Sequence, residues 1–480
     1  MSNRSESAIT RFAPSPTGYL HVGGLRSALF NYLWAKRTGG RFHLRIEDTD
    51  QARLVEDAES QIIESLSWLG ITWDGEIVRQ SERQKAHRSL ALELVKSRHA
   101  YVADESPEQL AEMRARQRSA TAPSYDGTAR EQGLSYDPDH PHQVIRFRWP
   151  DDPNLSVSFR NEIAGGRQVT ISRSEAPTMF EDFVLIKADG LPTYNFAHVV
   201  DDHEMGITDV IRGNEFISSA HKYAALSDVL GWNRPRYAFL PPILGPHGTK
   251  KLSKRDGAVS ALDYRDQGFL PEAVANFLAL IGWSPGGDRE YFGSLEELAE
   301  AFSLDRVQKS PGRFDEQKLR WLNGEHLKQR DPGEIAELAA SGGFWKASDD
   351  PHYDGRVLAQ ALQGIDTLSE LTEVAHGYFY HRPQLSAEQL IGDHPVADVA
   401  SWLERVNRGL AATEDWSADR IQNILMDIRE ELNLAPKELF PVLREALTGA
   451  PRTPAIWDLM TVLGREESLA RLEAAEALVA

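Results

Sequence analysis

Hydrophobic and polar residues near the start of the chain follow two different periods. Residues 9–13 (ITRFA) predict a short strand, and residues 14–24 (PSPTGYLHVGG) predict a loop rich in Pro and Gly. Apolar residues then recur at helical spacing, at Leu25, Ala28, Leu29, Tyr32 and Leu33. Gly39 and Gly40 end this helix, and residues 41–48 (RFHLRIED) alternate like a second strand. The order strand, Gly-rich loop, helix, strand predicts the first βαβ unit of a nucleotide-binding sheet.

The pattern changes near residue 105. Residues 106–109 (SPEQ) have the composition of a capping box with Pro at the first helical position, and residues 115–145 are polar and rich in turn formers. The sheet pattern resumes at residues 183–187 (FVLIK), and after a turn at 189–190 residues 194–200 continue it. We therefore predict that residues 105–185 form a domain inserted into the sheet.

Helical spacing dominates the chain after about residue 322. It is clearest at residues 402–410, 421–432 and 439–447. The predicted fold class is an α/β Rossmann-like catalytic domain with an inserted α+β domain, followed by all-α domains. A chain of 480 residues has ample length for several such domains.

Composition narrows the class of protein further. A hydrophobic content of 41% and a charged content of 26% are ordinary for a folded globular protein. The chain has no run of 18 apolar residues, no signal-like start and no cysteine, so we expect a cytoplasmic protein without disulfides. The net charge of −19 by itself argues against a nucleic-acid partner, although a local basic surface can coexist with an acidic remainder.

The loop at 14–24 is a candidate phosphate site. Gly18, Gly23 and Gly24 let a ligand approach the backbone, and the helix that follows presents amides and the positive end of its dipole to an anion. His21, just before this helix, could donate to a phosphate. The simpler interpretation is a Gly/Pro turn with His21 on the surface, and the P-loop spacing of glycine and lysine is absent.

A second loop carries clustered cations. Residues 245–257 (GPHGTKKLSKRDG) place Lys250, Lys251, Lys254 and Arg255 between glycines. Cations on a loop that closes over a polyphosphate could bind it as the transition state forms. An isolated KKLSKR is more often a solvated basic loop; its pairing with the upstream loop favours the polyphosphate site.

The two loops together resemble the signature motifs of class I aminoacyl-tRNA synthetases, and most closely those of the bacterial-type glutamyl-tRNA synthetases. Further blocks are similar to that family: RIEDTD (45–50), GLPTYNFAHVVDDHEMGITDVIRG (190–213), LPEAVANFLALIGWSP (270–285), FDEQKLRWLNGEHL (314–327) and REALTG (444–449). The similarity is strong over residues 11–327 and weaker from there to residue 480.

This resemblance implies a two-step, ATP-dependent reaction. The glutamate carboxylate attacks the ATP α-phosphate to give glutamyl-adenylate, and the 3′-terminal adenosine of tRNA(Glu) then takes the glutamyl group. Mg²⁺ accompanies the ATP, and no side-chain nucleophile is required. The implied domains are the catalytic halves 1–104 and 186–240, an acceptor-end-binding insertion 105–185, a stem-contact region 241–323 and an anticodon-binding region 324–480. A monomer is the expected state.

The resemblance also assigns site residues by position. The ATP site is expected to comprise His21, Gly23, Gly24, Glu215, Lys251 and Lys254, with His21 and Lys254 as catalytic residues. The L-glutamate site is expected to comprise Arg11, Ala13, Ser15, Glu47, Tyr194, His198 and Arg212. Arg11 and Arg212 suit the two carboxylates of glutamate, Glu47 suits its ammonium group, and Tyr194 supplies a rigid wall.

The sequence departs from the family pattern in three places. Some relatives hold structural zinc in the inserted domain through Cys and His, so a chain without Cys is expected to bind no zinc. His198 stands where relatives vary, and it either lines the amino-acid pocket or packs in the core. Residues 358–366 (LAQALQGID) lack the Arg with which some relatives are thought to select the glutamate tRNA, although Arg356 is close. The chain is therefore a candidate for charging tRNA(Gln) as well as tRNA(Glu).

Other functions fit parts of the sequence. A glutaminyl-tRNA synthetase would share the front half but would have β-barrels where residues 324–480 predict helices. The shortened glutamyl-queuosine type would lack the helical half. A small-molecule nucleotidyltransferase would need neither RIEDTD nor the helices, and a non-catalytic tRNA-binding paralogue would not need His21, Lys254 and Arg212 intact.

Overall fold

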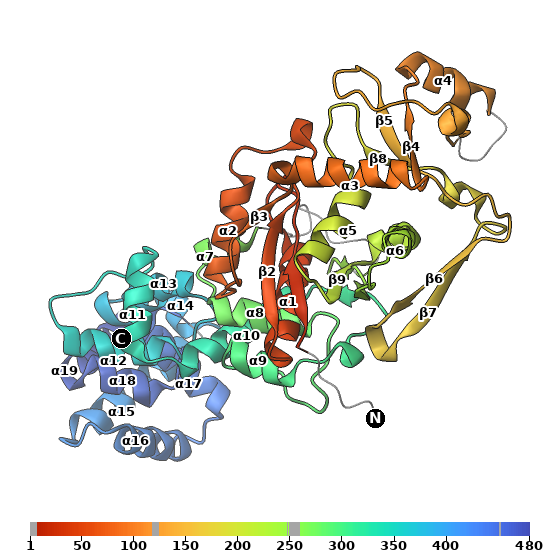
Figure 1. Ribbon diagram of the computed structural model, residues 1–480. Coiled ribbons are helices and arrows are strands. Elements are labelled where there is room, and N and C mark those ends of the chain that lie inside the picture. The colour runs from red at the N-terminus through yellow and green to blue at the C-terminus, as the bar shows by residue number, and fades with distance from the viewer. Residues whose placement is uncertain (1–6, 118–123, 247, 249–259, 451–452) are drawn as a thin grey trace. The chain divides into compact units, whose positions relative to one another are not determined.

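The computed structural model describes residues 7–117, 124–246, 248, 260–450 and 453–480 (Figure 1). The chain forms two compact units. The first comprises Met1–Leu262 and Ala275–Asp315, and the second comprises Asp263–Val274 and Glu316–Ala480. Among the described residues, no helix is both long and apolar enough to span a lipid bilayer.

A parallel sheet forms the centre of the first unit. Strands β1 (Ile9–Phe12), β2 (Arg41–Ile46) and β3 (Val78–Arg79) pair in parallel in the order β1-β2-β3. On the other side of β1, β9 (Asp209–Gly213) pairs in parallel with β10 (Arg236–Leu240). A backbone hydrogen bond of 2.9 Å from Thr208 N to Ile9 O places β9 beside β1. The strand order reverses between β1 and β9, and such a switch point is where ligands bind in open α/β sheets.

Helix α1 (Val22–Arg37) connects β1 to β2 and contacts β1, β2 and β9. Its buried residues include the predicted Leu25, Ala28, Leu29, Tyr32 and Leu33. The predicted strand–loop–helix–strand opening is thus confirmed. Helix α2 (Ala58–Trp68) follows β2 along the chain.

The predicted insertion contributes to two different sheets. Strands β4 (Ala100–Ala103), β5 (Val144–Phe147) and β8 (Val184–Ile186) form a small antiparallel sheet. The hairpin of β6 (Ser156–Asn161) and β7 (Arg167–Ser172) instead extends the parallel sheet, because β6 pairs with β10. Helix α4 (Pro107–Arg116) begins at the predicted capping box, in which Ser106 Oγ accepts from Gln109 N and Gln109 Oε1 accepts from Ser106 N.

The prediction for residues 183–200 is wrong in two respects. Residues 184–186 do form a strand, β8, but it pairs with β5 in the small antiparallel sheet and not in the central one. Residues 194–200 belong to a helix, α5 (Tyr194–Glu204), and not to a strand. Phe196, Val199 and Val200 are buried at spacings of three and four residues, and a short apolar run of this kind fits a strand and a helix equally well until packing decides.

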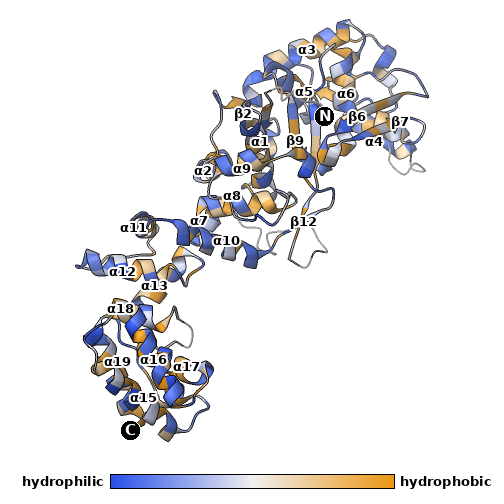
Figure 2. Cartoon of the chain, turned by 90° about the horizontal axis from the view of Figure 1, so that it is seen from below, coloured by the Kyte–Doolittle hydropathy of each residue, from blue (hydrophilic) through white to orange (hydrophobic). Residues whose placement is uncertain are grey.

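The second unit is helical, as predicted. Its longer helices are α10 (Glu316–Gln329), α15 (Val396–Ala411), α16 (Ala418–Glu431), α17 (Pro436–Thr448) and α19 (Arg465–Val479). Hydrophobic and hydrophilic residues alternate along these helices in Figure 2, as expected of helices with one buried face. The buried faces meet in one core, which includes Leu403, Val406, Leu425, Leu443 and Leu472.

The remaining elements complete the two units. In the first unit they are α3 (Gln84–Lys96), α6 (Ala220–Val229), β11 (Ile243–Leu244), α9 (Leu295–Ala301) and β12 (Gly312–Arg313). In the second unit they are α11 (Pro332–Ser341), α12 (Pro351–Ala361), α13 (Leu371–Ala375), α14 (Ala387–Ile391) and α18 (Ile456–Leu463). Two helices, α7 (Ala261–Asp266) and α8 (Pro271–Leu280), contain the boundaries between the units.

The turn between α1 and β2 allows a stability prediction. A Cβ on Gly40 would lie 1.8 Å from Ala8 O, and that backbone is held by hydrogen bonds from Ala8 N to Thr38 Oγ1 and from Arg41 N to Ala8 O. We expect Gly40→Ala to lower the free energy of unfolding by about 1–3 kcal/mol, as overpacking does. Gly39→Asn is the control, because Gly39 has φ +67° with open space around a Cβ and Asn tolerates that conformation. Denaturant midpoints measure both; equal midpoints would contradict the steric argument.

Candidate active site

A cleft of about 520 Å³ opens at the carboxyl ends of the parallel strands. The segments after β1, β2, β9 and β10 all contribute to it, together with the start of α1 and of α5. The cleft therefore lies at the switch point between β1 and β9. The predicted site residues that line it are Arg11, Ala13, Ser15, His21, Gly23, Gly24, Glu47, Tyr194, Arg212 and Glu215.

His21 is the N-cap of α1. Its Nδ1 accepts hydrogen bonds from Gly23 N (3.1 Å) and Gly24 N (3.3 Å), and so caps two amides that the first helical turn leaves unpaired. An Nδ1 that accepts places the ring proton on Nε2. His21 thus orders the helix start, and the dipole of α1 favours an anion at the same end of the cleft.

Gly24 allows the loop to pack closely against the helix. A Cβ at this position would lie 2.5 Å from Leu20 Cδ1. Leu20 also lines the cleft and is buried. The glycine therefore brings the backbone of the loop and the first turn of α1 together at the cleft wall.

Arg212 is a buried cation that has no carboxylate partner in the part of the chain that the structure describes. Its guanidinium lies 3.6 Å from the centroid of the Phe216 ring and 5.3 Å from that of Tyr194. Its Nε and Nη1 are buried and make no hydrogen bond with the described residues. Burial lowers the pKa of Arg212 to about 10, so the group is still charged at neutral pH. An unpaired buried guanidinium is costly, and an anionic ligand would offset that cost.

Arg11 and Glu47 are already paired within the protein. Arg11 Nε donates to Asp202 (2.9 Å), and Arg45 donates both to Asp202 (2.6 Å) and to Glu47 (2.9 Å). Burial raises the pKa of the Glu47 carboxyl, and the nearby guanidinium groups oppose that shift. With both carboxylates ionised, Arg11, Arg45 and Arg212 leave one positive charge uncompensated in this buried group. The cleft therefore favours an anion.

His198 does not line this cleft. Its ring stacks on the far side of Tyr194, with 5.4 Å between ring centroids, and faces a separate cavity of about 280 Å³ that also contains Asp202 and Trp232. Tyr194 itself lines the cleft, and its buried hydroxyl makes no hydrogen bond with the described residues. Of the two interpretations of His198, packing behind the wall matches its position.

Lys251 and Lys254, predicted for the ATP phosphates, lie outside the described residues, as does most of the lysine loop. Ser260, just after that loop, pairs with His21 in an antiparallel bridge. The chain just after the lysine loop thus lies beside the start of α1.

Arg26 is a cleft residue that the sequence interpretation missed. It lies one helical turn after Gly23, is nearly fully buried, and donates to Ile281 O (3.2 Å) and to Pro241 O. Burial lowers its pKa to about 10. The available signal was a charged residue on the buried face of a predicted helix, because such a residue needs internal partners.

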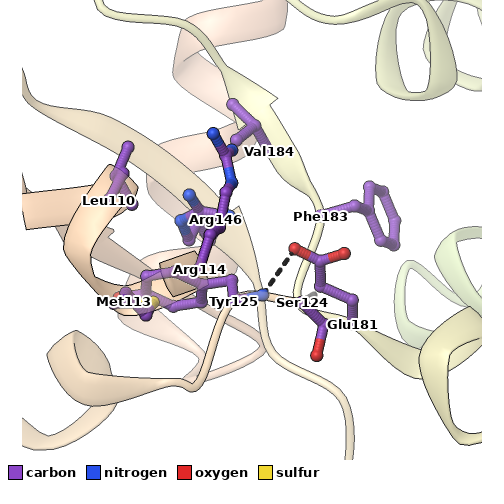
Figure 3. A pocket seen from close by; sticks show the side chains of 9 residues that line it. All are labelled: Leu110, Met113, Arg114, Ser124, Tyr125, Arg146, Glu181, Phe183 and Val184. Carbon is purple, nitrogen blue, oxygen red and sulfur yellow. Dashed lines mark hydrogen bonds between the residues drawn. The ribbon is translucent and has the colours of Figure 1, made fainter. Parts of the chain in front are cut away.

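A third cavity, of about 230 Å³, lies in the small antiparallel sheet beside α4 (Figure 3). The Arg146 guanidinium covers the Tyr125 ring at 3.8 Å from its centroid, and Glu181 accepts a hydrogen bond of 2.8 Å from Tyr125 N. None of the predicted site residues within the described ranges lines this cavity. The large cleft is therefore the candidate active site.

A parallel sheet with a His- and Gly-containing helix start at its switch point, followed by a helical unit, is the arrangement expected of a class I aminoacyl-tRNA synthetase, and the family profiles show that class. The family profile "tRNA synthetases class I (E and Q), catalytic domain" matches residues 7–321, and "Anticodon binding domain" matches residues 326–476.

Curated relatives and solved structures match over nearly the whole chain. Glutamate–tRNA ligase 2 of Rhizorhabdus wittichii is 40% identical, with 98% of each chain covered, and the glutamate–tRNA ligase of Azorhizobium caulinodans is 40% identical over 97% of this chain and 98% of its own. The crystal structure of a glutamate tRNA ligase from Elizabethkingia meningosepticum, in complex with its amino acid, superimposes with a TM-score of 0.81 at 30% identity, covering 99% of this chain and 100% of that one. The chain belongs to the glutamate–tRNA ligase family.

The position of His198 generates a prediction for acid stability. Burial lowers its pKa to about 3, whereas an unfolded histidine titrates near about 6.5. Between these values the unfolded state binds a proton that the folded state does not, so the free energy of unfolding falls as pH decreases from about 6.5. We expect the His198 ring signals in NMR to show no titration between about pH 5 and 8. His198→Asn should make the loss of stability between about pH 6.5 and 5 shallower; a ring that titrates near pH 6 would contradict the assignment.

Proposed function

We propose that the cleft binds ATP at the start of α1 and L-glutamate beside Arg212, and that the chain uses them to attach glutamate to tRNA. The observation that carries the amino-acid site is Arg212, a buried guanidinium without an anionic partner among the described residues. The adjoining helix start, capped by His21, supports the nucleotide site in the same cleft. Glutamate and the ATP α-phosphate would then meet between the two ends.

Opposite charges within the amino-acid site orient glutamate. Arg212 and the terminal nitrogens of Arg11 suit its carboxylates, and Glu47 suits its ammonium group. Tyr194 and Phe216 flank Arg212 and limit the directions from which a carboxylate can approach it. Ala13 and Ser15 supply the wall after β1.

The reaction then requires the protein to position the substrates and to stabilise charge, and it needs no side-chain nucleophile. An oxygen of the glutamate α-carboxylate attacks the α-phosphorus of ATP, and pyrophosphate leaves with the bonding electron pair. The terminal hydroxyl of the tRNA attacks the carbonyl carbon of the adenylate, and AMP leaves. His21 and the dipole of α1 stabilise the phosphate charge, and Lys254 and Lys251 are proposed to reach it from the lysine loop.

We propose that Mg²⁺ enters with ATP. The cleft-lining carboxylates are Glu47 and Glu215, and Glu47 is already hydrogen-bonded to Arg45. Glu215 remains as the carboxylate that fits a metal bound chiefly by ATP phosphates, because Mg²⁺ commonly takes one or two carboxylates besides phosphate oxygens. The ion would neutralise phosphate charge.

The tRNA specificity is proposed to be wide. Residues 358–366 contribute Leu358, Ala361, Leu362 and Ile365 to the core of the helical unit. The exposed positions Ala359, Gln363 and Gly364 carry no charge, and the half-exposed Asp366 is paired with Arg320. This stretch therefore offers no cation of its own to distinguish one anticodon from another, which favours acceptance of tRNA(Gln) as well as tRNA(Glu).

The amino-acid site is tested by Arg212→Ala. Loss of one charge-assisted contact of about 1.5–3 kcal/mol should raise the KM for glutamate by about 10- to 100-fold in ATP–pyrophosphate exchange with tRNA present. The KM for ATP should change by less than about threefold. Arg234→Ala is the control, because Arg234 is on the surface of the same unit, paired with Asp228. An unchanged KM for glutamate would remove Arg212 from the site.

Charging of purified tRNA(Glu) and tRNA(Gln), side by side with labelled glutamate, tests the function and its breadth together. We expect glutamate on both tRNAs, because the described surface at 358–366 has no arginine or lysine with which to discriminate. Strong charging of tRNA(Glu) alone would contradict the wide specificity and leave the ligase function in place. Charging of neither would contradict the function itself.

A further inference from the structure

One buried carboxylate joins two residues of the cleft wall from behind. Asp202 lies on α5 and is 4% exposed. Its Oδ1 accepts from Arg11 Nε (2.9 Å) and from Arg45 Nη1 (2.6 Å). Arg11 lines the cleft, whereas Asp202 lies behind it. Asp202 therefore acts on the cleft through its partners.

Arg45 extends this connection to the second wall residue. It is fully buried on β2, and its Nη2 donates to Glu47 Oε1 (2.9 Å). A planar guanidinium with one nitrogen on Asp202 and the other on Glu47 fixes the distance and direction between the two carboxylates. Arg11 and Glu47 lie at the ends of different strands. One hydrogen-bond network, through Asp202 and Arg45, thus connects the two residues.

We propose that Asp202 and Arg45 are positioning residues for the amino-acid substrate, which set Arg11 and Glu47 at the spacing of a glutamate carboxylate and ammonium group. This inference rests on the proposed function of the cleft. Asp202 binds Arg11 through Nε, so the Nη1 and Nη2 fork can turn to the substrate. Arg45 likewise occupies one oxygen of Glu47 and leaves the other for an ammonium group.

Asp202, which joins Arg11 to Arg45, carries its negative charge at neutral pH. Burial acts to raise the pKa of Asp202, but Arg11 and Arg45 outweigh it and hold that pKa well below its usual range. Asp202 is therefore ionised at neutral pH and accepts hydrogen bonds from both arginines.

The neighbouring Asp201 provides a matched control. It is also fully buried on α5, and it accepts from Arg83 (2.7 Å), from Gln80 (2.8 Å) and from His87 Nε2 (2.9 Å) if that nitrogen carries the proton. None of these partners lines the cleft. Asp201 and Asp202 are thus adjacent buried carboxylates with arginine partners, and among these partners only Arg11, which is bound to Asp202, lines the cleft.

The test compares Asp202→Asn with Asp201→Asn in the full-length chain by glutamate-dependent ATP–pyrophosphate exchange with tRNA(Glu) present. We expect Asp202→Asn to raise the KM for glutamate by about 10- to 100-fold, since a displacement of about 1 Å can cost about 100-fold. The KM for ATP should stay within about threefold of wild type. Asp201→Asn should leave both KM values within about threefold, whatever it does to the melting temperature.

Asp202→Asn removes a buried charge and could prevent folding, so two further variants retain the charge at the substituted position. Asp202→Glu retains the carboxylate and should partly restore the KM for glutamate. Arg45→Lys retains the positive charge but cannot reach Asp202 and Glu47 with two forked nitrogens, so it should raise that KM.

The outcomes separate the two proposals. Equal KM values for glutamate in Asp202→Asn and Asp201→Asn, or a normal value in Arg45→Lys, would overturn the positioning role. If Asp202→Asn does not fold, Arg45→Lys and Asp202→Glu decide the question. Absence of glutamate-dependent exchange in the wild-type protein would instead overturn the proposed function.

Discussion

Among its described residues, the first unit buries three arginines but only two neighbouring carboxylates at the carboxyl ends of its parallel strands. The arrangement of the cleft depends on this excess of positive charge. Arg11, Arg45 and Arg212 are all nine-tenths buried or more, and Glu47 and Asp202 are their carboxylate neighbours. Charges in such a place must be paired, because their desolvation is otherwise too costly. Arg11 and Arg45 are paired with Asp202 and Glu47, whereas Arg212 forms no such pair with the described residues and can bind an anionic ligand. The same feature that makes the burial of Arg212 costly thus favours an anionic ligand in the cleft.

The parallel sheet brings these groups together from distant parts of the chain. Arg11 lies on β1 and Arg212 on β9, Glu47 comes directly after β2, and Asp202 lies on α5. The carboxyl ends of parallel strands meet at one edge, and the reversal of strand order opens a cleft there. The helix start capped by His21 lies at the same edge, so the proposed nucleotide and amino-acid sites adjoin in one cleft. The excess of positive charge would favour both anions, which would otherwise repel each other.

An acidic chain that acts on tRNA needs a local positively charged surface within a molecule of net negative charge. The net charge of −19 describes the whole molecule, whereas phosphate binding depends on local cations. The family match supplies the RNA partner that the composition obscures, with an anticodon-binding domain over residues 326–476. The helical unit has its own apolar core, which includes residues from all of its longer helices.

Sequence alone determined the elements whose signals are local. The helix at 22–37 with its preceding loop, the capping box at Ser106 and the helices of the second unit all follow from spacing and capping chemistry. The family resemblance also chose ten residues that line the cleft, because motif order preserves their positions on the strands. Tertiary structure decided what depends on partners far along the chain. It made residues 194–200 a helix, placed His198 behind Tyr194, buried Arg26 at the cleft, and joined Asp202 to Arg11 and Arg45. A short apolar run or a single charged residue has no fixed meaning in sequence, because only packing determines which face is buried and which opposite charge lies within a hydrogen bond.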